Sequence, residues 1–445
     1  MMSGMSAESG LLAVTILAAV LATKSTHGPL AWALWLWVGV MALRTVAPLP
    51  LTPMNETAAI IIAVGLTFLT LPQLHPHRKI RTSPKPIHQS RGVAHTRFVI
   101  ASVVAIGMVL AGAIAFRNNI GAATGTPYDN LTTVQIRRAQ VSTAQGAGFL
   151  ALLATAQPIL SCLGVYGTLR YHWAWSFLAV AALAVSLQTP GRTTIISLLV
   201  TTLAFYLYLR NIIPRRKPRR FKRPPALAIA TAGVAALVIF NTIGTQLGKN
   251  DVARSYFPAY WWPAWTLAGL LYLVGGLSAL SVAQQTNFDP FEQFNSIFAL
   301  VRLANFADPA IKPPDTLGAD VNIPIPFNVF TGFGQVYFDF GIVGVAAMAY
   351  LLGSLAVTSH RRAVAGSLGW VWVSATVAAL LAYLPAGYRL FTLDVVFQLG
   401  VGSLAFYWLR ETKPIGQLQK SAHSHRVHLK GSDHHSAWAC TPSEP

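Results

Sequence analysis

The sequence predicts an all-α polytopic membrane protein with about eleven transmembrane helices and one large external loop that contains helical and re-entrant elements. Of the 445 residues, 53% are hydrophobic and only 11% are charged, and the mean hydropathy is +0.50. So few polar residues cannot cover a soluble globule of this length. The apolar residues also gather in segments that approach the roughly 20 residues of a spanning helix.

Eleven segments are apolar enough to span a membrane, although several are short. They cover residues 10–23, 29–43, 57–74, 98–116, 147–165, 173–187, 195–209, 225–243, 335–357, 367–384 and 390–409. No Lys or Arg precedes the first of them, which argues against a cleaved signal peptide. The two cysteines, Cys162 and Cys440, make neither a disulfide framework nor a zinc site.

Basic residues between the apolar segments predict the orientation. Most of the net charge of +19 lies in the loops 75–97 and 210–224 and in the His-rich tail 410–445. Such runs are typical of cytoplasmic loops rather than of nucleic-acid binding, and the tail composition predicts disorder. Arg361 and Arg362 then fall inside as well. We therefore expect a multi-pass protein of the inner (plasma) membrane, with its N-terminus outside and its C-terminus in the cytoplasm.

Residues 260–283 form a further long apolar segment. The basic loop before it and Arg361 after it require an even number of crossings, and the segments on either side already supply two. Trp261 favours the membrane interface, while Pro263 and the pair Gly275 and Gly276 interrupt a straight span. The segment is therefore interpreted as a re-entrant or interfacial element.

These assignments divide the chain into helices 1 to 8 within residues 1–243, an external cap loop at 244–334, and three helices within 335–409. The cap loop holds six of the fourteen acids, which are Asp251, Asp289, Glu292, Asp308, Asp315 and Asp320. It is also rich in aromatic residues, which favours an ordered cap. Aromatic side chains at helical spacing predict an amphipathic helix at 288–307.

The strongest candidate for a functional site is the stretch 328–344, NVFTGFGQVYFDFGIVG, where the cap loop returns to the membrane. It carries Asp339 in apolar sequence, which costs a few kcal/mol unless the carboxylate is paired or hydrated. Arg192 and Arg389 lie in short external turns, and guanidinium groups bind phosphate in a bidentate manner. The alternative is that the carboxylate pairs within the bundle and that the arginines reach lipid headgroups.

Three motifs carry a family resemblance. The segment NVFTGFGQVYFDFGIVGVAAMAYLLG resembles the signature of Wzy-type oligosaccharide repeat-unit polymerases, and QTPGRTTIISLLV and YLVGGLSAL resemble that family in the expected order. The resemblance implies a GT-C-like bundle. It also implies a polysaccharide polymerase that transfers a polyprenyl-diphosphate-linked glycan onto another lipid-linked repeat unit at the external membrane face. No metal and no cofactor are expected.

Under this interpretation Asp339, Arg192 and Arg254 are the catalytic candidates, and the substrate-binding candidates are Arg302, Arg389, Tyr337, Asn328 and Tyr272. Arginines would stabilise the charge that grows on a departing diphosphate. Asp339 either takes a proton from the acceptor or orients its neighbours. The expected partners are the lipid-linked donor and acceptor, membrane lipid and a chain-length regulator protein, with no nucleic acid. The alternatives are an O-antigen ligase-like glycosyltransferase and a lipid-linked sugar flippase or secondary transporter.

Overall fold

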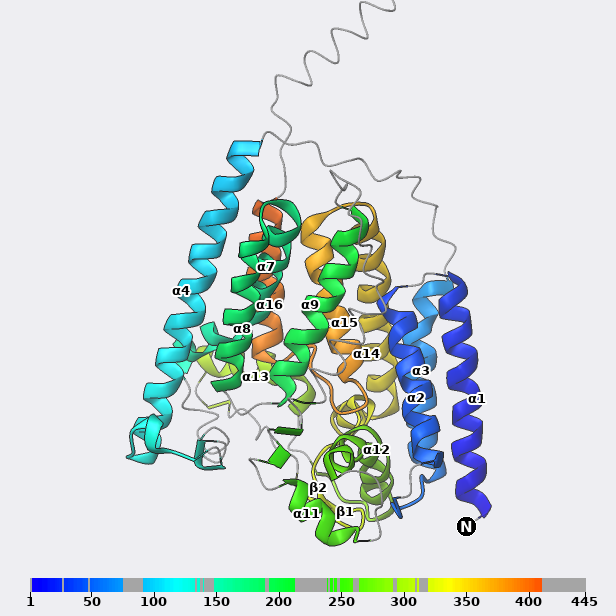
Figure 1. Ribbon diagram of the computed structural model, residues 1–445. Coiled ribbons are helices and arrows are strands. Elements are labelled where there is room, and N and C mark those ends of the chain that lie inside the picture. The colour runs from blue at the N-terminus through cyan, green and yellow to red at the C-terminus, as the bar shows by residue number, and fades with distance from the viewer. Residues whose placement is uncertain are drawn as a thin grey trace, which may run out of the picture.

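The structure is a computed structural model and shows an all-α membrane protein (Figure 1). It describes residues 2–25, 28–46, 49–74, 91–132, 134–136, 139, 148–188, 192–212, 238, 241–242, 244–245, 249–258, 264–290, 294–308, 310–311 and 319–409. Within these residues, five helices are long and apolar enough to cross a bilayer, and five shorter apolar helices accompany them.

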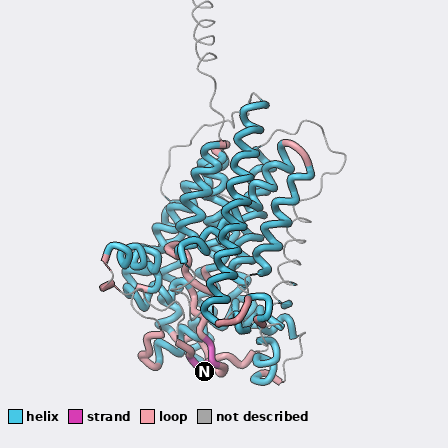
Figure 2. Tube along the Cα trace, turned by 90° about the vertical axis from the view of Figure 1, so that its left-hand side faces the viewer, coloured by secondary structure: helices cyan, strands magenta, loops and turns pink. Residues whose placement is uncertain are grey.

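The helices follow one another in a simple up-and-down order through most of the chain (Figures 1 and 2). The first half contains α1 (Met2–Ser25), α2 (Pro29–Val46), α3 (Glu56–Leu74), α4 (Arg91–Thr124), η1 (Tyr128–Asn130), α6 (Gly148–Leu152), η2 (Leu153–Ala156), α7 (Gln157–Arg170), η3 (Trp173–Ser176), α8 (Phe177–Gln188) and α9 (Arg192–Ile212). The second half contains α11 (Lys249–Tyr256), α12 (Ala264–Gln285), η4 (Asn295–Ile297), α13 (Phe298–Ala307), β1 (Val321–Asn322), β2 (Pro326–Phe327), α14 (Gly332–Val364), α15 (Leu368–Tyr383) and α16 (Leu393–Trp408).

Ten of the eleven apolar segments predicted from the sequence coincide with apolar helices of the structure. The remaining segment, 225–243, lies outside the described residues except for Val238, Asn241 and Thr242. The count of eleven spans therefore stays a prediction, as does the GT-C-like arrangement.

The two ends of the bundle differ in the charged residues that they carry. We call one the basic end, because Arg97, Arg170, Arg210, Arg361 and Arg362 lie in the helix turns there. We call the other the acidic end, because the segments that meet there carry all nine acids of the described residues: Glu8, Glu56, Asp129, Asp251, Asp289, Asp308, Asp320, Asp339 and Asp394. The described helix ends that flank the two basic loops, the end of α3, the start of α4 and the end of α9, thus lie on one side (Figure 1).

Among the described residues, the two largest of four buried clusters belong to two groups of helices that share α15. One group packs α1, α2, α3, α12 and α14 against one part of α15, around side chains such as Trp37 and Leu381. The other packs α4, α7, α8, α9 and α16 against the remaining part, around Trp372 and Phe406, whose rings stack at 5.4 Å. Because α15 contributes to both groups, a change in its core residues affects the whole bundle.

Glycines bring some helix pairs into backbone contact. A Cβ placed on Gly353 of α14 would lie 2.2 Å from the carbonyl oxygen of Leu69 in α3. One placed on Gly112 of α4 would lie 2.0 Å from the backbone nitrogen of Ala154. Small residues at such crossings are the usual way for membrane helices to pack closely without a hydrophobic driving force.

The acidic end is covered by α11, α12 and the short antiparallel β1–β2 ribbon, in which Val321 pairs with Phe327 (Figures 1 and 2). Residues 260–283 were interpreted as re-entrant or interfacial, and α12 occupies most of this range. In its second half, the hydroxyl of Ser278 donates to the carbonyl oxygen of Thr52, and the hydroxyl of Ser281 accepts the backbone N–H of Asn55. Apolar side chains of the same half, Val274, Leu277 and Leu280, pack into the core with α2, α3 and α14. The re-entrant or interfacial interpretation stays a prediction.

The aromatic helix predicted at 288–307 is shorter in the structure. Its α-helical part, α13, begins only at Phe298, after the 3-10 turn η4. Phe294 stands immediately before η4 with a φ of 68°, a left-handed conformation that interrupts a helix. The pattern of aromatic residues therefore predicted a helix start at residue 288, which lies before the actual start of α13 at Phe298.

Candidate functional site

The candidate site is built around the start of α14. Thr331 begins this helix, and its side-chain oxygen accepts a hydrogen bond of 3.1 Å from the backbone N–H of Gly334. Asp339 lies eight residues further along, roughly two turns inside the helix. The helix then breaks at Gly341, whose φ of 64° and ψ of −164° are accessible to glycine and costly for other residues.

Three glycine-containing motifs meet beside this helix start, at a point we call the glycine junction. A Cβ on Gly276 of α12 would lie 3.1 Å from the carbonyl oxygen of Pro385 and 3.2 Å from the nitrogen of Thr331. A Cβ on Gly332 would lie 2.8 Å from the carbonyl oxygen of Gly387. The motifs YLVGGLSAL, NVFTGFG and PAGYR, far apart in the sequence, are therefore in backbone contact.

The carboxylate of Asp339 is bound by the cap loop. One oxygen accepts the backbone N–H of Asn295 at 3.2 Å, and the other accepts that of Ser296 at 2.6 Å. These are the first amides of η4, which have no partner of their own within the helix. Asp339 therefore joins α14 to the turn that leads into α13.

Arg389 lies in the loop between α15 and α16, next to the glycine junction. Its guanidinium pairs with Asp394 in the first turn of α16 and lies 5.4 Å from the centroid of the Tyr383 ring. Burial is the largest single influence and lowers the pKa of Arg389, but the charges of Asp394 and Tyr383 and the hydrogen bond to Asp394 together raise it by more, so the net pKa is raised. The side chain is 18% exposed, so this fixed cation still reaches the surface at the acidic end.

Two hydrogen bonds connect the Arg389 loop to the rest of the site. The backbone N–H of Tyr388 donates to the side-chain oxygen of Gln335 in α14. The N–H of Ala299 in α13 donates to the carbonyl oxygen of Phe391 at 2.8 Å. Arg302 lies on α13, where its guanidinium is 5.9 Å from the ring of Phe298. The structure thus brings Asp339, Arg302 and Arg389 into one connected region.

The remaining predicted residues lie around this region or outside what the structure describes. Tyr337 faces Phe338 within α14 at 5.9 Å, and the ring of Tyr272 lies 6.4 Å from that of Phe327, next to the exposed Asn328. Arg254 is exposed on α11. The side chain of Arg192 lies outside the described residues, although α9 begins at this position.

Sequence reasoning missed the partners of the predicted residues. The pairing of Asp394 could have been predicted from the sequence, because an acid in the first turn of a helix, five residues after an arginine, favours an ion pair across the turn. The amides of Asn295 and Ser296 carry no such signal, since every residue type except proline supplies a backbone N–H. Among the described residues, no three His, Cys, Asp or Glu side chains come together in a way that could hold a metal.

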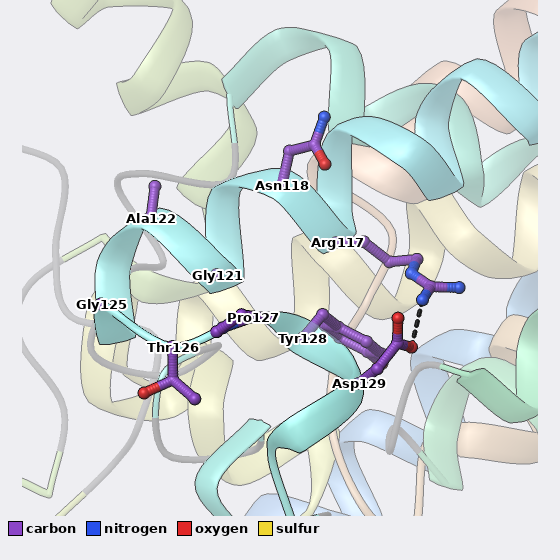
Figure 3. Close-up of a pocket in the computed structure, with 9 residues that line it drawn as sticks. All are labelled: Arg117, Asn118, Gly121, Ala122, Gly125, Thr126, Pro127, Tyr128 and Asp129. Carbon is purple, nitrogen blue, oxygen red and sulfur yellow. Dashed lines mark hydrogen bonds and ion pairs between the residues drawn. The ribbon is translucent and has the colours of Figure 1, made fainter.

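An open pocket of about 660 Å³ lies at the acidic end of α4 (Figure 3). Its lining consists of Arg117, Asn118, Gly121, Ala122, Gly125, Thr126, Pro127, Tyr128 and Asp129. Arg117 pairs with Asp129, and its guanidinium lies 5.1 Å from the centroid of the Tyr128 ring. The Tyr128 hydroxyl donates to the carbonyl oxygen of Gln188, four residues before Arg192 in the chain. The sequence did not predict this pocket.

A comparison of the chain with protein-family models, curated proteins and solved structures finds no match.

Proposed function

We propose that this protein is a membrane glycosyltransferase that polymerises oligosaccharide repeat units carried on polyprenyl diphosphate. The observation that supports the proposal most strongly is the glycine junction. Two motifs that resemble the polymerase family, around Gly276 and Gly332, contact each other there, and the loop that carries Arg389 completes the contact. Motifs that resemble those of an enzyme family are expected to lie close together where the substrate binds.

The charges suit a diphosphate leaving group. In the proposed reaction a hydroxyl oxygen of the acceptor sugar bonds to the anomeric carbon of the donor. The bond from that carbon to the diphosphate oxygen breaks, and the diphosphate leaves with the electron pair. Arg389 is held by Asp394 and Tyr383 before substrate arrives, so it is pre-organised to stabilise the growing negative charge. Arg302 on α13 and the exposed Arg254 are further cations at the same end.

The charge asymmetry supports an active face outside the cytoplasm. Cytoplasmic loops of membrane proteins carry an excess of Lys and Arg. The basic end would then face the cytoplasm and the acidic end, with the candidate site, the outside. In this orientation the N-terminal helix α1 begins outside and α16 ends inside (Figure 1).

One observation favours the transporter alternative. Discontinuous helices commonly form the substrate sites of secondary transporters, and α14 is discontinuous at Gly341. The break lies nine residues after the start of α14, or roughly 14 Å from the acidic end along a helix, whereas the middle of this 33-residue helix lies roughly 25 Å from that end. An enzyme that acts at the membrane surface therefore remains the better-supported proposal.

The test determines on which face of the membrane lipid-linked repeat units accumulate in cells that carry Arg389→Ala. We expect polymer to be lost and single lipid-linked repeat units to accumulate on the outer face, where an impermeant sugar-modifying reagent detects them. The exposed Asn328→Ala serves as a milder comparison within the same motif. Units that accumulate on the cytoplasmic face would instead identify a flippase. Normal polymer in the Arg389→Ala strain would contradict the proposed site.

A further inference from the structure

We propose that Asp339 is a positioning residue and not the proton acceptor of the reaction. It acts by fixing α13 and, through it, the loop that carries Arg389. The inference rests on the proposed function for its catalytic meaning, while its structural part stands on hydrogen bonds alone. The proton of the acceptor hydroxyl then passes to the leaving diphosphate oxygen, which receives the negative charge that the step creates.

The first argument is that both carboxylate oxygens are already bound. The amides of Asn295 and Ser296 donate to different oxygens of Asp339, at 3.2 and 2.6 Å. Backbone amides at the start of a helix bind an ionised carboxylate well, since the bonds are charge-assisted and the helix dipole favours a negative charge there. Because each oxygen of Asp339 already accepts one such bond, each has less room to accept a proton from a substrate hydroxyl.

The second argument is that the surrounding backbone is shaped for this contact. Gly341 breaks α14 two residues after Asp339, with a φ of 64°. Phe294 adopts a left-handed conformation immediately before η4, and its ring lies 6.0 Å from that of Phe340. Two unusual backbone conformations on opposite sides of one carboxylate are expected where a contact must be held in place.

The third argument is that the Asp339 contact also positions α13 and the loop that carries Arg389. Ser296 leads directly into α13, and Ala299 in its first turn donates to the carbonyl oxygen of Phe391. Phe391 stands two residues after Arg389. The placement of α13 therefore sets both Arg302, which it carries, and the loop that presents Arg389. Loss of the Asp339 contact would therefore remove one support of both cations, although Asp394 and Gln335 would still hold the Arg389 loop.

The test compares two substitutions at the same position. Asn cannot take the proton but can still accept an N–H through its side-chain oxygen, whereas Ala can do neither. A positioning role predicts that Asp339→Asn keeps at least about tenfold more polymerase activity than Asp339→Ala, and that its rate keeps the pH profile of the unchanged protein. A general base predicts that both variants fall equally, by about 10²- to 10⁴-fold, and that the acidic limb of the profile disappears. That second outcome would overturn the proposal.

A second measurement does not depend on activity. Amide hydrogen exchange of the purified full chain should be at least about tenfold faster at Asn295 and Ser296 in Asp339→Ala, because bonds to a charged acceptor are lost. Gly341→Ala should produce the same local change, since its Cβ meets no atom within 4 Å and acts only through the φ of 64°. The exposed Asp320→Ala and the unobstructed Gly107→Ala in α4 serve as matched controls.

The two readouts separate the possible failures. Faster exchange without any polymerase activity in the unchanged protein would retain the positioning contact and reject the proposed function. Unchanged exchange at Asn295 and Ser296 in Asp339→Ala would reject the positioning role, whatever the activity.

Discussion

Arg44 at the end of α2 lies 2.9 Å from a carboxylate oxygen of Glu8 in α1, and its side chain is only 5% exposed. Its guanidinium also donates to the hydroxyl of Ser278 in α12 at 2.7 Å and to the carbonyl oxygen of Thr52 at 2.7 Å. The backbone N–H of Met54 donates to the same oxygen of Glu8. One arginine thus joins four segments at the acidic end, and every bond satisfies a group that would be costly to bury alone.

Replacing Arg44 should therefore destabilise the bundle strongly. Arg44→Ala leaves Glu8 largely buried without its partner, and the removal of one member of a buried pair typically costs about 3–5 kcal/mol. The free energy of unfolding, measured with denaturant in detergent, checks this value. Arg117→Ala is the matched control, because its partner Asp129 is 79% exposed, and we expect a loss below about 1 kcal/mol. Equal losses in the two variants would contradict the structural role of Arg44.

Gly353 provides a test of the contact between α3 and α14. A glycine-to-alanine change inside a helix usually stabilises by about 0.5–1 kcal/mol. At Gly353 the added Cβ meets backbone at 2.2 Å, so the two helices must separate, and we expect a loss of about 1–3 kcal/mol instead. Gly107→Ala, which meets nothing within 4 Å, should not destabilise. The melting temperatures of both variants in detergent measure the difference, and a stabilised Gly353→Ala would show that the helices do not touch there.

Tyr388 carries a buried hydroxyl with no hydrogen-bond partner among the described residues. Burial raises its pKa above the ordinary value of 10, so the folded protein keeps this proton while the unfolded chain loses it. The ionisation of Tyr388 therefore leaves the free energy of unfolding unchanged well below pH 10 and lowers it as the pH rises from 10 toward the folded pKa. Tyr388→Phe should raise the free energy of unfolding at neutral pH by up to about 1 kcal/mol and make its decline above pH 10 shallower.

The exposed Tyr256→Phe is the control for that experiment, and it should change neither the free energy of unfolding nor its pH dependence. If Tyr388→Phe destabilised the protein at neutral pH, its hydroxyl would have a partner in solution. A gain in stability accompanied by a loss of polymer would instead place the hydroxyl in contact with substrate, since binding groups are often kept at the expense of stability.

The Arg389–Asp394 pair should be measurably coupled. A double-mutant cycle on the free energy of unfolding, with Arg389→Ala and Asp394→Ala, is expected to give a coupling of about 1–2 kcal/mol, because both side chains are mostly buried. The same cycle on Arg117 and Asp129 should give less than about 0.5 kcal/mol. A coupling near zero for the first pair would show that Arg389 is not held in advance of substrate, which would remove the argument for pre-organisation.

Much of the helical framework could be predicted from the chain itself. Apolar segments of the right length must be helical in a bilayer, because each backbone amide needs a partner inside its own segment. The two basic loops predicted that the described ends of α3, α4 and α9 share one side, while the parity argument that sets residues 260–283 apart from the spanning helices stays a prediction. The start of α13 was missed because it depends on the conformation of Phe294, a residue whose type gives no warning of a left-handed φ.

In the candidate site, too, the sequence predicted some residues but not their partners. Asp339 and Arg389 were recognisable as charged residues in positions that require partners. Their actual partners are the backbone amides of Asn295 and Ser296 for one and Asp394 for the other. Arg44 and Glu8, which lie 36 residues apart, gave no pattern that would pair them.

By itself, the sequence determined an all-α membrane bundle, the side on which its basic residues gather, and the charged residues at its opposite end. Hydrophobicity and charge act residue by residue, so they can be read along the chain. The tertiary structure alone decided that the motifs around Gly276, Gly332 and Gly387 touch, and that Asp339 binds a turn 43 residues earlier in the chain. Such contacts depend on how closely two backbones approach in space, which no single segment specifies.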